Sequence, residues 1–309
     1  MLRAGIDIGG TKIAGGVVDA DGQILERVRV DTPEDTAALA QVVIDIIDRF
    51  RATHEIAAVG VAAAGFIDRE RTTVIHAPNI AWRSEPLKAI LCHGTGLPVT
   101  IENDANAAGW AEYRFGAGRG VQHMVMLTIG TGVGGAIVLD GELLRGGHGA
   151  AAELGHLRVV RDGRPCGCGQ DGCLEQYASG RAIQREASQI ADTDGIGQAL
   201  AAHRAENGSI SGPAVSRLLL AGDPGATEAI RRVASALGQA CASLQAVLDP
   251  ELFVIGGGVA ELGEEFLRPV RAAYSASIPG RSDRPTAQFA IADLVNDAGL
   301  MGAAALACA

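Results

Sequence analysis

The sequence predicts an α/β protein made of two similar lobes. The main observation is an internal repeat: residues 7–19 read DIGGTKIAGGVVD, and residues 128–140, which lie 121 positions later, read TIGTGVGGAIVLD. In both copies two apolar runs flank a glycine turn, and a repeat of this size indicates two lobes of similar architecture. The second observation is length, because 309 residues are sufficient for two hydrophobic cores.

Local patterns predict the individual strands and helices. Runs rich in β-branched residues indicate three strands at the start of the chain, over residues 3–8, 13–18 and 24–30. Apolar residues recur with helical spacing over 36–51, and the near-continuous apolar run at 56–63 is typical of a buried strand. Further along, the same signals predict strands at 99–101 and 252–255 and helices at 180–205, 225–248 and 297–309.

We expect the lobes to divide near residue 105. Residues 1–105 would form a small N-terminal lobe, joined by the C-terminal helix 297–309, and residues 106–296 a large lobe. Glycine is abundant at 42 residues whereas aromatic residues make up 4%, which indicates much backbone in tight turns or close to a ligand.

Charge and hydropathy exclude several classes of protein. The formal net charge is −10 and no run of lysine or arginine occurs, so a nucleic-acid surface is not expected. Asp7 interrupts the first apolar run before the core of a signal peptide could form, and no apolar stretch is long enough to span a membrane. We therefore expect a cytoplasmic protein with reduced thiols. Isolated cysteines at 92, 241 and 308 are interpreted as buried small hydrophobes.

A cluster of metal-ligand residues stands out in the middle of the chain. His156 is followed by Cys166, Cys168 and Cys173, so three of the six cysteines lie within eight residues. One imidazole and three thiolates are a ligand set of four-coordinate structural zinc, and filling all four positions leaves none for a water nucleophile. A disulfide and a redox or unligated cluster are the alternatives.

Glycines and carboxylates surround this cluster. Gly167, Gly169 and Gly172 interleave the thiols, where we expect positive φ angles that bend the chain around one ion. Glu153 and Glu175 flank the ligands, and a metal that fixes both would hold two hydrogen-bond acceptors over a shared space. Such a pair suits a ligand rich in hydroxyl donors, and a sugar is the obvious candidate.

Three glycine-rich turns are candidates for phosphate binding. Gly9, Gly10, Thr11 and Lys12 form the turn of the first repeat, Thr131 and Gly132 belong to the turn of the second, and Gly256, Gly257 and Gly258 follow the strand at 252–255. Backbone N–H groups in such turns can bind phosphate oxygens, and absent side chains allow a nucleotide to approach closely. A nucleoside triphosphate could lie between the two turns of the repeat. A plain hairpin turn is the alternative for each one alone.

Asn103 and Asp104 lie where a strand ends and a helix begins, a place where cleft residues of α/β sheets occur. A carboxylate there could accept the proton of a hydroxyl that is being phosphorylated. The alternative is that Asp104 serves only as a helix N-cap.

Taken together, five segments closely resemble the ROK family of sugar kinases and repressors, and most nearly its bacterial glucokinases. They are GIDIGGTK at 5–12, ENDANAA at 102–108, ELGH at 153–156, CGCGQDGCLE at 166–175 and VIGGGV at 254–259. The resemblance covers almost the whole chain and implies two ribonuclease-H-like lobes of the actin/hexokinase-like ATPase superfamily, with a cleft between them. It also implies ATP-dependent phosphorylation of a hexose at O6, glucose first, by a homodimer or homotetramer.

The resemblance assigns roles to individual residues. Asp104 would be the general base for the sugar O6, while Asn79, Asn103, Glu153, His156 and Glu175 would hold the other hydroxyls. Zinc would be bound by His156, Cys166, Cys168 and Cys173. ATP, with Mg²⁺ on its phosphates, would meet residues 9–12, Thr131, Gly132 and 256–258.

Other functions stay open at this point. An N-acetylglucosamine or N-acetylmannosamine kinase would share these motifs, because the pocket around C2 of the sugar cannot be identified from sequence. A repressor of this family would carry a DNA-binding region before the strand at residue 3, for which we expect no room here. A sugar sensor without catalysis would fit poorly with an intact Asp104.

Overall fold

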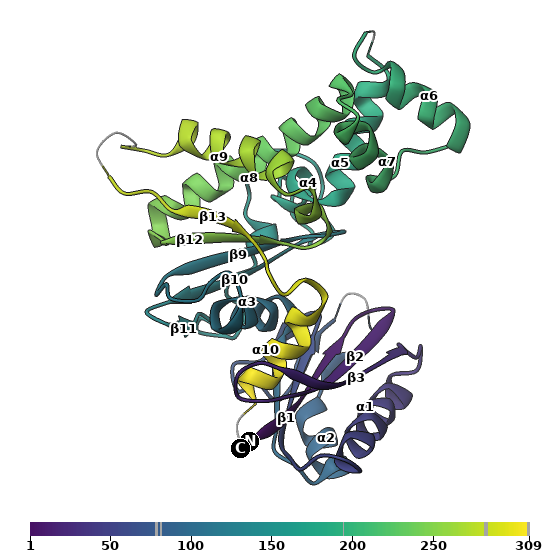
Figure 1. Cartoon of the computed structure of the whole chain (residues 1–309), viewed down its shortest axis with the longest axis vertical. Helices are drawn as coiled ribbons and strands as arrows, with labels where there is room; N and C mark the ends of the chain where they lie inside the picture. The colour runs from purple at the N-terminus through teal and green to yellow at the C-terminus, as the bar shows by residue number, and fades with distance from the viewer. Residues whose placement is uncertain (78–79, 81, 194, 281–283, 308–309) are drawn as a thin grey trace. The chain divides into compact units, whose positions relative to one another are not determined.

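The computed structural model describes residues 1–77, 80, 82–193, 195–280 and 284–307 and divides into two compact units (Figure 1). The first unit contains Met1–Val125, Ala136–Ala152 and Asp293–Ala309, and the second contains Met126–Gly135 and Glu153–Ala292. Strands and helices are mixed in both, which confirms the predicted α/β class. The predicted lobe boundary at residues 105 and 106 stays a prediction, because compact units report local packing and not functional lobes.

The first unit is built on a five-stranded sheet with the order β3-β2-β1-β4-β8. The strands are β1 (Leu2–Ile8), β2 (Lys12–Val18), β3 (Ile24–Asp31), β4 (Ile56–Ala63) and β8 (Val99–Asn103). Strands β1, β2 and β3 form an antiparallel meander, whereas β4 and β8 continue the sheet in parallel with β1. These strands lie within two residues of the predicted ones.

Helices cover both faces of this sheet (Figure 1). They are α1 (Thr36–Arg51), α2 (Leu87–Thr95), α3 (Asp104–Phe115) and α10 (Ala298–Leu306), with a short helix η3 (Val295–Asp297) before the last. Helix α1 has the predicted bounds, and its Leu39, Val43, Ile47 and Phe50 are fully buried in the core. A small sheet of β5 (Phe66–Ile67), β6 (Val74–His76) and β7 (Arg83–Glu85) completes the unit.

Helix α10 packs unusually close to the sheet, because glycines leave room for its backbone. A Cβ atom on Gly5 of β1 would lie 1.9 Å from the carbonyl oxygen of Leu300, and one on Gly60 of β4 would lie 1.8 Å from that of Ala303. On the other side of the helix, a Cβ on Gly302 would lie 1.7 Å from the carbonyl oxygen of Ala107 in α3. Helix α10 is therefore held between the sheet and α3.

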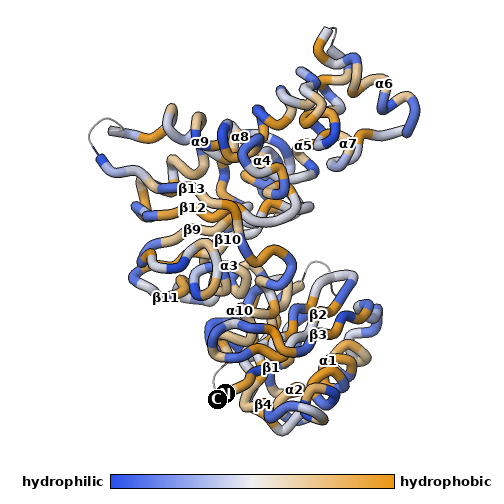
Figure 2. The backbone as a smooth tube through the Cα atoms, viewed as in Figure 1, coloured by the Kyte–Doolittle hydropathy of each residue, from blue (hydrophilic) through white to orange (hydrophobic). Residues whose placement is uncertain are grey.

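A second five-stranded sheet repeats the plan of the first. Its order is β11-β10-β9-β12-β13, with strands β9 (Met124–Ile129), β10 (Val133–Leu139), β11 (Glu142–Leu143), β12 (Leu252–Gly256) and β13 (Gln288–Ile291). As in the first sheet, the two strands at one edge, β10 and β11, are antiparallel, and the two at the other edge, β12 and β13, are parallel. The internal repeat predicted from the sequence is confirmed. Figure 2 shows β1 and β12 in orange, the colour of apolar residues.

The remaining helices belong to the second unit. They are η1 (Leu154–His156), α4 (Glu175–Ala178), α5 (Gly180–Ala191), α6 (Gln198–Asn207), α7 (Gly212–Leu220), α8 (Pro224–Leu248), η2 (Gly258–Leu262) and α9 (Glu264–Ser277). The stretch predicted as helical over 180–205 forms two helices. Helix α5 ends at Ala191 with Asp192 as its C-cap, and Gly195, with a φ of 88°, lies in the connection to α6. No helix among the described residues is long and apolar enough to cross a membrane.

The close packing of α10 generates a first prediction. We expect Gly60→Ala to lower the free energy of unfolding by about 1–3 kcal/mol, because the new methyl group would overlap the backbone of α10 and neither backbone can give way. The control is Gly212→Ala at the start of α7, where the nearest atom to the new Cβ would be 3.9 Å away. Urea unfolding would compare the two variants, and equal midpoints would contradict this account of the packing.

Candidate active site and metal centre

The junction of β8 and α3 carries the predicted general base. Asn103, and not Asp104, is the N-cap of α3: its Oδ1 accepts a hydrogen bond from the backbone N–H of Asn106 at 3.0 Å. The side-chain amide of Asn103 also donates to the carbonyl oxygen of Gly65 at 3.1 Å. The alternative that Asp104 only caps the helix is therefore wrong, and its carboxylate is available for another task.

The environment of Asp104 suits a base. Its Oδ1 accepts a hydrogen bond from the N–H of Ala105 at 2.9 Å. Burial raises the pKa of Asp104, against smaller opposite effects of hydrogen bonds from its own backbone, Ala105 and Asn103. A carboxylate with a raised pKa accepts a proton more readily than an ordinary one, which is what a general base at neutral pH needs.

A second carboxylate lies beside it. Asp7 is the penultimate residue of β1, and burial together with the neighbouring charge of Asp104 raises the pKa of Asp7 to about 6, with a smaller lowering by Arg29. The first turn of α10 covers Asp7, since a Cβ on Gly299 would lie 2.4 Å from its Oδ2. The sequence analysis did not assign a role to Asp7. The available signal was a charged residue inside an otherwise apolar strand directly before a glycine turn.

Glu102 is a third acidic side chain at this end of the sheet, and it is structural. Only 4% of its side chain is exposed, and its Oε2 forms an ion pair with Nε of Arg145 at 2.7 Å. Its Oε1 accepts hydrogen bonds from the backbone of Asn103 and from Nδ2 of Asn106, both at 3.2 Å. Glu102 therefore fixes the end of β8 and the first turn of α3, on which Asp104 stands.

The turn between β1 and β2 is also in the first unit. It is closed by a hydrogen bond from the N–H of Gly9 to the carbonyl oxygen of Lys12 at 3.0 Å. Thr32, directly after β3, supports the turn, because its hydroxyl donates to the carbonyl oxygen of Gly9 at 2.7 Å. Gly10, Thr11 and Lys12 are exposed, so a turn held rigidly from behind presents its tip to solvent.

In the second unit, the start of β10 connects the predicted sugar and nucleotide residues. The backbone N–H of Val133 donates to Oε2 of Glu175 at 3.1 Å, and a Cβ on Gly155 of η1 would lie 2.1 Å from the carbonyl oxygen of Val133. The η1 turn, which follows Glu153 and ends at His156, thus packs on the same residue that anchors Glu175. Gly132 also lies against Glu175, since a Cβ added to Gly132 would lie 2.2 Å from Oε2 of Glu175.

The glycines after β12 lie close to this turn. Gly257 has a φ of 80°, and a Cβ there would lie 2.6 Å from the carbonyl oxygen of Ile129, the last residue of β9. A Cβ on Gly258 would meet no atom within 4 Å. The structure therefore brings the predicted nucleotide residues Thr131 and Gly132 and the glycines 256–258 to one end of the second sheet, with open space beside Gly258.

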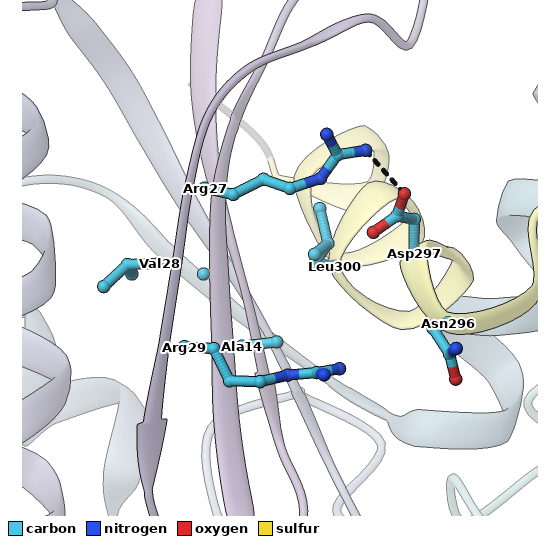
Figure 3. Close-up of a pocket in the computed structure, with 8 residues that line it drawn as sticks. Ala14, Arg27, Val28, Arg29, Asn296, Asp297 and Leu300 are labelled. Carbon is cyan, nitrogen blue, oxygen red and sulfur yellow. Dashed lines mark hydrogen bonds and ion pairs between the residues drawn. The ribbon is translucent and has the colours of Figure 1, made fainter.

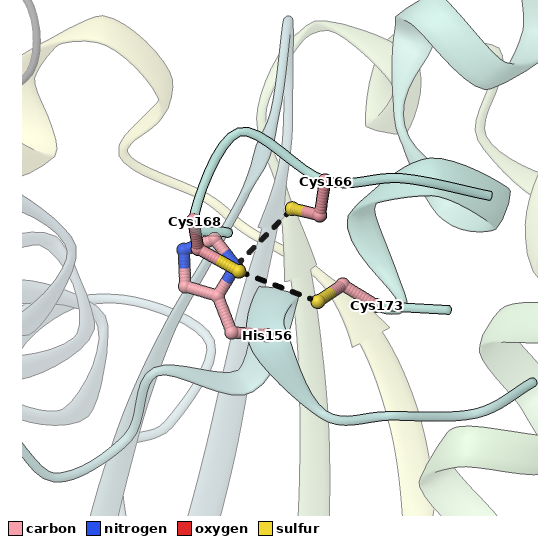
Figure 4. A group of neighbouring side chains, drawn as sticks. All are labelled: His156, Cys166, Cys168 and Cys173. Atoms are coloured by element: carbon pink, nitrogen blue, oxygen red, sulfur yellow. Dashed lines mark hydrogen bonds between the residues drawn. The ribbon is translucent and has the colours of Figure 1, made fainter. Parts of the chain in front are cut away.

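His156 and the three cysteines form the cluster predicted from the sequence. Their ligand atoms lie within 4.8 Å of one another and point toward a common centre (Figure 4). The Sγ atoms of Cys168 and Cys173 are 3.6 Å apart, and Sγ of Cys166 is 3.7 Å from Nδ1 of His156. A tetrahedral zinc ion with bonds of about 2.3 Å to sulfur would separate its ligands by about 3.7 Å.

The other interpretations of the cluster fit less well. The three cysteines are free thiols, and a disulfide would require a sulfur–sulfur distance of about 2.05 Å. Burial and the neighbouring thiols raise the pKa of Cys173 to about 12, so Cys173 would bind a metal as a thiolate only where the cation itself favours the deprotonated form. The cluster is compatible with a structural zinc ion.

The knuckle is shaped by two of its three glycines. Gly169 and Gly172 have φ angles of 89° and 79°, as predicted, whereas Gly167 is not in the left-handed region. The N–H of Cys166 donates to the carbonyl oxygen of Gln170 at 2.8 Å and closes the loop. Leu174 donates to the carbonyl oxygen of Leu157 at 2.8 Å, which joins the end of the knuckle to the segment after His156.

The structure therefore distributes the predicted site residues over both units. The first unit holds Gly9–Lys12, Asn103 and Asp104, and the second holds Thr131, Gly132, Glu153, His156, Glu175 and the glycines 256–258. Asn79 lies outside the described residues. That these groups act on one substrate stays a prediction.

Two sheets of the same plan, each opening with a strand–turn–strand unit, define the actin/hexokinase-like ATPase fold, which the similar solved structures of sugar kinases share. The chain belongs to the ROK family, whose model matches residues 3–309.

Relatives of known activity match the whole chain. A glucokinase of Streptomyces coelicolor is 46% identical over 308 residues, which cover 99% of this chain and 97% of that protein. The crystal structure of a ROK family glucokinase from Streptomyces griseus, in complex with glucose and AMPPNP, is similar with a TM-score of 0.87 and 45% identity over 99% of both chains. An N-acetylmannosamine kinase of Vibrio cholerae is 34% identical over 285 residues, 89% of this chain and 90% of that protein.

The carboxylate pair generates a prediction on stability. Because the pKa of Asp7 is raised in the folded state, its ionisation lowers stability as pH rises from about 4 through 6. We expect Asp7→Asn to raise the free energy of unfolding at pH 7.5 by on the order of 2 kcal/mol and to have no such effect near pH 4. Thermal unfolding without ligands would measure this, with Asp21→Asn in an exposed turn as control. If Asp7→Asn raised the free energy of unfolding equally at pH 4 and pH 7.5, the ionisation of Asp7 would not be the cause.

Proposed function

We propose that this chain is an ATP-dependent glucokinase, which transfers the terminal phosphoryl group of ATP to O6 of glucose. The observation that carries this proposal is a buried carboxylate of raised pKa, Asp104, at the start of α3 directly after the parallel strand β8, in a chain similar to glucokinases along its whole length. The presence of glucose and an ATP analogue in the Streptomyces griseus structure supports the choice of both substrates.

Asp104 would accept the proton of the glucose 6-hydroxyl as the bond from O6 to phosphorus forms and the bond from phosphorus to the β–γ bridging oxygen of ATP breaks. The products are glucose 6-phosphate, ADP and a protonated Asp104, which returns its proton to water. Asn103 and Glu102 make no proton transfer in this scheme. They hold the strand end and the helix so that the carboxylate stays in place.

The sugar would be recognised mainly by acceptors. Asn103, Glu153, His156 and Glu175, with Asn79, are proposed to bind the hydroxyl groups that do not react. Hydrogen bonds to charged acceptors contribute roughly 1.5–3 kcal/mol each when shielded from water. Because the ring nitrogen Nδ1 of His156 faces the cysteines, Nε2 would be the nitrogen that meets the sugar.

ATP would be bound through the glycine turns. The proposed contacts are Gly9, Gly10, Thr11, Lys12, Thr131 and Gly132 for the phosphates and Gly256, Gly257 and Gly258 for the rest of the nucleotide. Mg²⁺ would accompany the phosphates and neutralise part of their charge, and Asp7, beside the first turn, offers the carboxylate oxygen that this ion prefers.

A zinc ion in the His156 and cysteine cluster would have a structural role. With four protein ligands it would tie η1 to the knuckle and hold Glu153 and Glu175 on either side. Zinc thiolate sites need reduced thiols, which supports a cytoplasmic location. The proposed role in glycolysis rests on the proposed reaction with glucose. A homodimer or homotetramer remains an expectation from the family.

N-acetylmannosamine phosphorylation is the second candidate, supported by the similarity to the Vibrio cholerae kinase. A coupled assay with glucose, mannose, N-acetylglucosamine and N-acetylmannosamine, each with ATP and with polyphosphate, separates the candidates. We expect the highest kcat/KM for glucose with ATP. A higher value for an N-acetylated hexosamine would replace the proposal.

The assignment of the base is tested by Asp104→Asn. Removing the proton acceptor is expected to lower kcat by about 10²–10⁴-fold, while the Kd for glucose measured by calorimetry changes by less than about fivefold. The amide keeps the shape of the side chain and its hydrogen bond from Ala105. A kcat within tenfold of the parent would show that another group takes the proton.

The role of the cluster is tested by Cys168→Ser. We expect the variant to lose bound zinc and to have a KM for glucose at least about tenfold higher, because Glu153 and Glu175 lose their common support. Metal analysis and steady-state kinetics would be compared with Cys92→Ser, a thiol of α2 outside the cluster. Absence of zinc from the purified parent protein, or an unchanged KM in the variant, would reject this role.

A further inference from the structure

One row of residues across the first sheet carries alternating charged and small side chains. Arg29 of β3 pairs with Ala14 of β2, which pairs with Asp7 of β1, and the row continues through Ala62 of β4 to Glu102 of β8. Residues that are directly opposite in neighbouring strands point to the same face of a sheet. Arg29, Asp7 and Glu102 therefore share one face, with only alanines between them.

The charges on this face are not equally paired. Glu102 has Arg145 as its partner at 2.7 Å. Arg27, two residues before Arg29 and on the same face, forms an ion pair with Asp297 at 2.6 Å. Arg29, in contrast, forms neither an ion pair nor a side-chain hydrogen bond with any described residue.

Arg29 lines a cavity of about 300 Å³ between β3 and the start of α10. Ala14 and Gly15 line it from β2, and Asn296 and Leu300 from the helical side. Val28 and the ion pair of Arg27 with Asp297 complete the lining, so the carboxylate of Asp297 is neutralised by Arg27. In Figure 3 the side chains of Arg27 and Arg29 both extend from β3 toward α10, where Arg27 meets Asp297 and Arg29 passes Ala14. The volume is many times what one water molecule needs, so a tetrahedral anion fits beside the guanidinium.

The simplest alternative is that Arg29 only balances the charge of Asp7. The geometry speaks against it, because Arg29 and Asp7 lie two strands apart in the row and form no ion pair or hydrogen bond with each other. Asp7 and Asp104 together would repel a polyphosphate that approached them, unless a cation on the same face offset their charge. Arg29 is the uncommitted cation in that position.

We propose that Arg29, assisted by the amide of Asn296, binds the phosphoryl group that is transferred, on the α10 side of Asp7. A guanidinium suits this task because its planar donors match the oxygens of a phosphate. This inference rests on the proposed function for the identity of the anion. The same phosphoryl group belongs to the nucleotide before transfer and to the sugar phosphate after it.

Arg29→Gln and Arg27→Gln form a matched pair, since both remove one guanidinium from the same face of β3. We expect Arg29→Gln to raise the Kd of AMPPNP, of glucose 6-phosphate or of both at least tenfold by calorimetry, with the Kd of glucose unchanged. Loss with AMPPNP alone would assign the contact to the donor, and loss with glucose 6-phosphate alone to the product. Arg27→Gln should stay within twofold of the parent for every ligand.

Further variants keep the proposal falsifiable. Arg29→Lys should recover part of the lost affinity, and that affinity should fall more steeply with salt in the parent than in Arg29→Gln. Asn296→Ala should weaken the same ligand about threefold or more. Unchanged affinities in Arg29→Gln, or an equal loss in Arg27→Gln, would overturn the proposal. If the parent bound AMPPNP but did not phosphorylate glucose, the proposed function would be wrong. The AMPPNP affinities of Arg29→Gln and Arg27→Gln would still test the anion site in that case.

Discussion

The first unit depends on the contact of helix α10 with bare backbone. Gly5 and Gly60 on the sheet and Gly302 on the helix allow carbonyl groups to lie where any side chain would collide. Because the helix is clamped between β1, β4 and α3, it fixes α3 relative to the sheet and places its own first turn on Asp7. The distance between Asp7 and Asp104, on which the electrostatics of the site rest, is therefore a consequence of backbone packing.

The charged side chains near Asp104 differ in how fully they are paired. Glu102 is buried and fully engaged with Arg145 and with the start of α3, so it serves the scaffold. Asp7 and Asp104 are buried side by side, and this costs stability that a purely structural design would avoid. Arg29 shares their face of the sheet without a partner. A ligand that brought the missing charges would offset this cost.

In the second unit a single residue of the main chain joins three functions. Val133 donates its N–H to Glu175, supports Gly155 of the η1 turn through its carbonyl oxygen, and follows directly on the Thr131–Gly132 turn. The His156 and cysteine cluster lies at the other end of η1 and of the knuckle. The residues proposed to bind sugar, nucleotide and metal are thus connected by short paths of hydrogen bonds and packing contacts, so a disturbance of one is expected to reach the others.

The sequence by itself determined most of the helices and strands and the set of side chains available for chemistry. The bounds of α1, the repeat of the two sheets and the ligand set of the cluster follow from periodicity and spacing, which act over a few residues. The tertiary structure alone decided that Asn103 caps α3, that Arg145 reaches Glu102 from 43 residues away, and that Asp7 meets Asp104. These relations depend on strand order and on the depth of helix packing, and no local pattern encodes the distance between two strands.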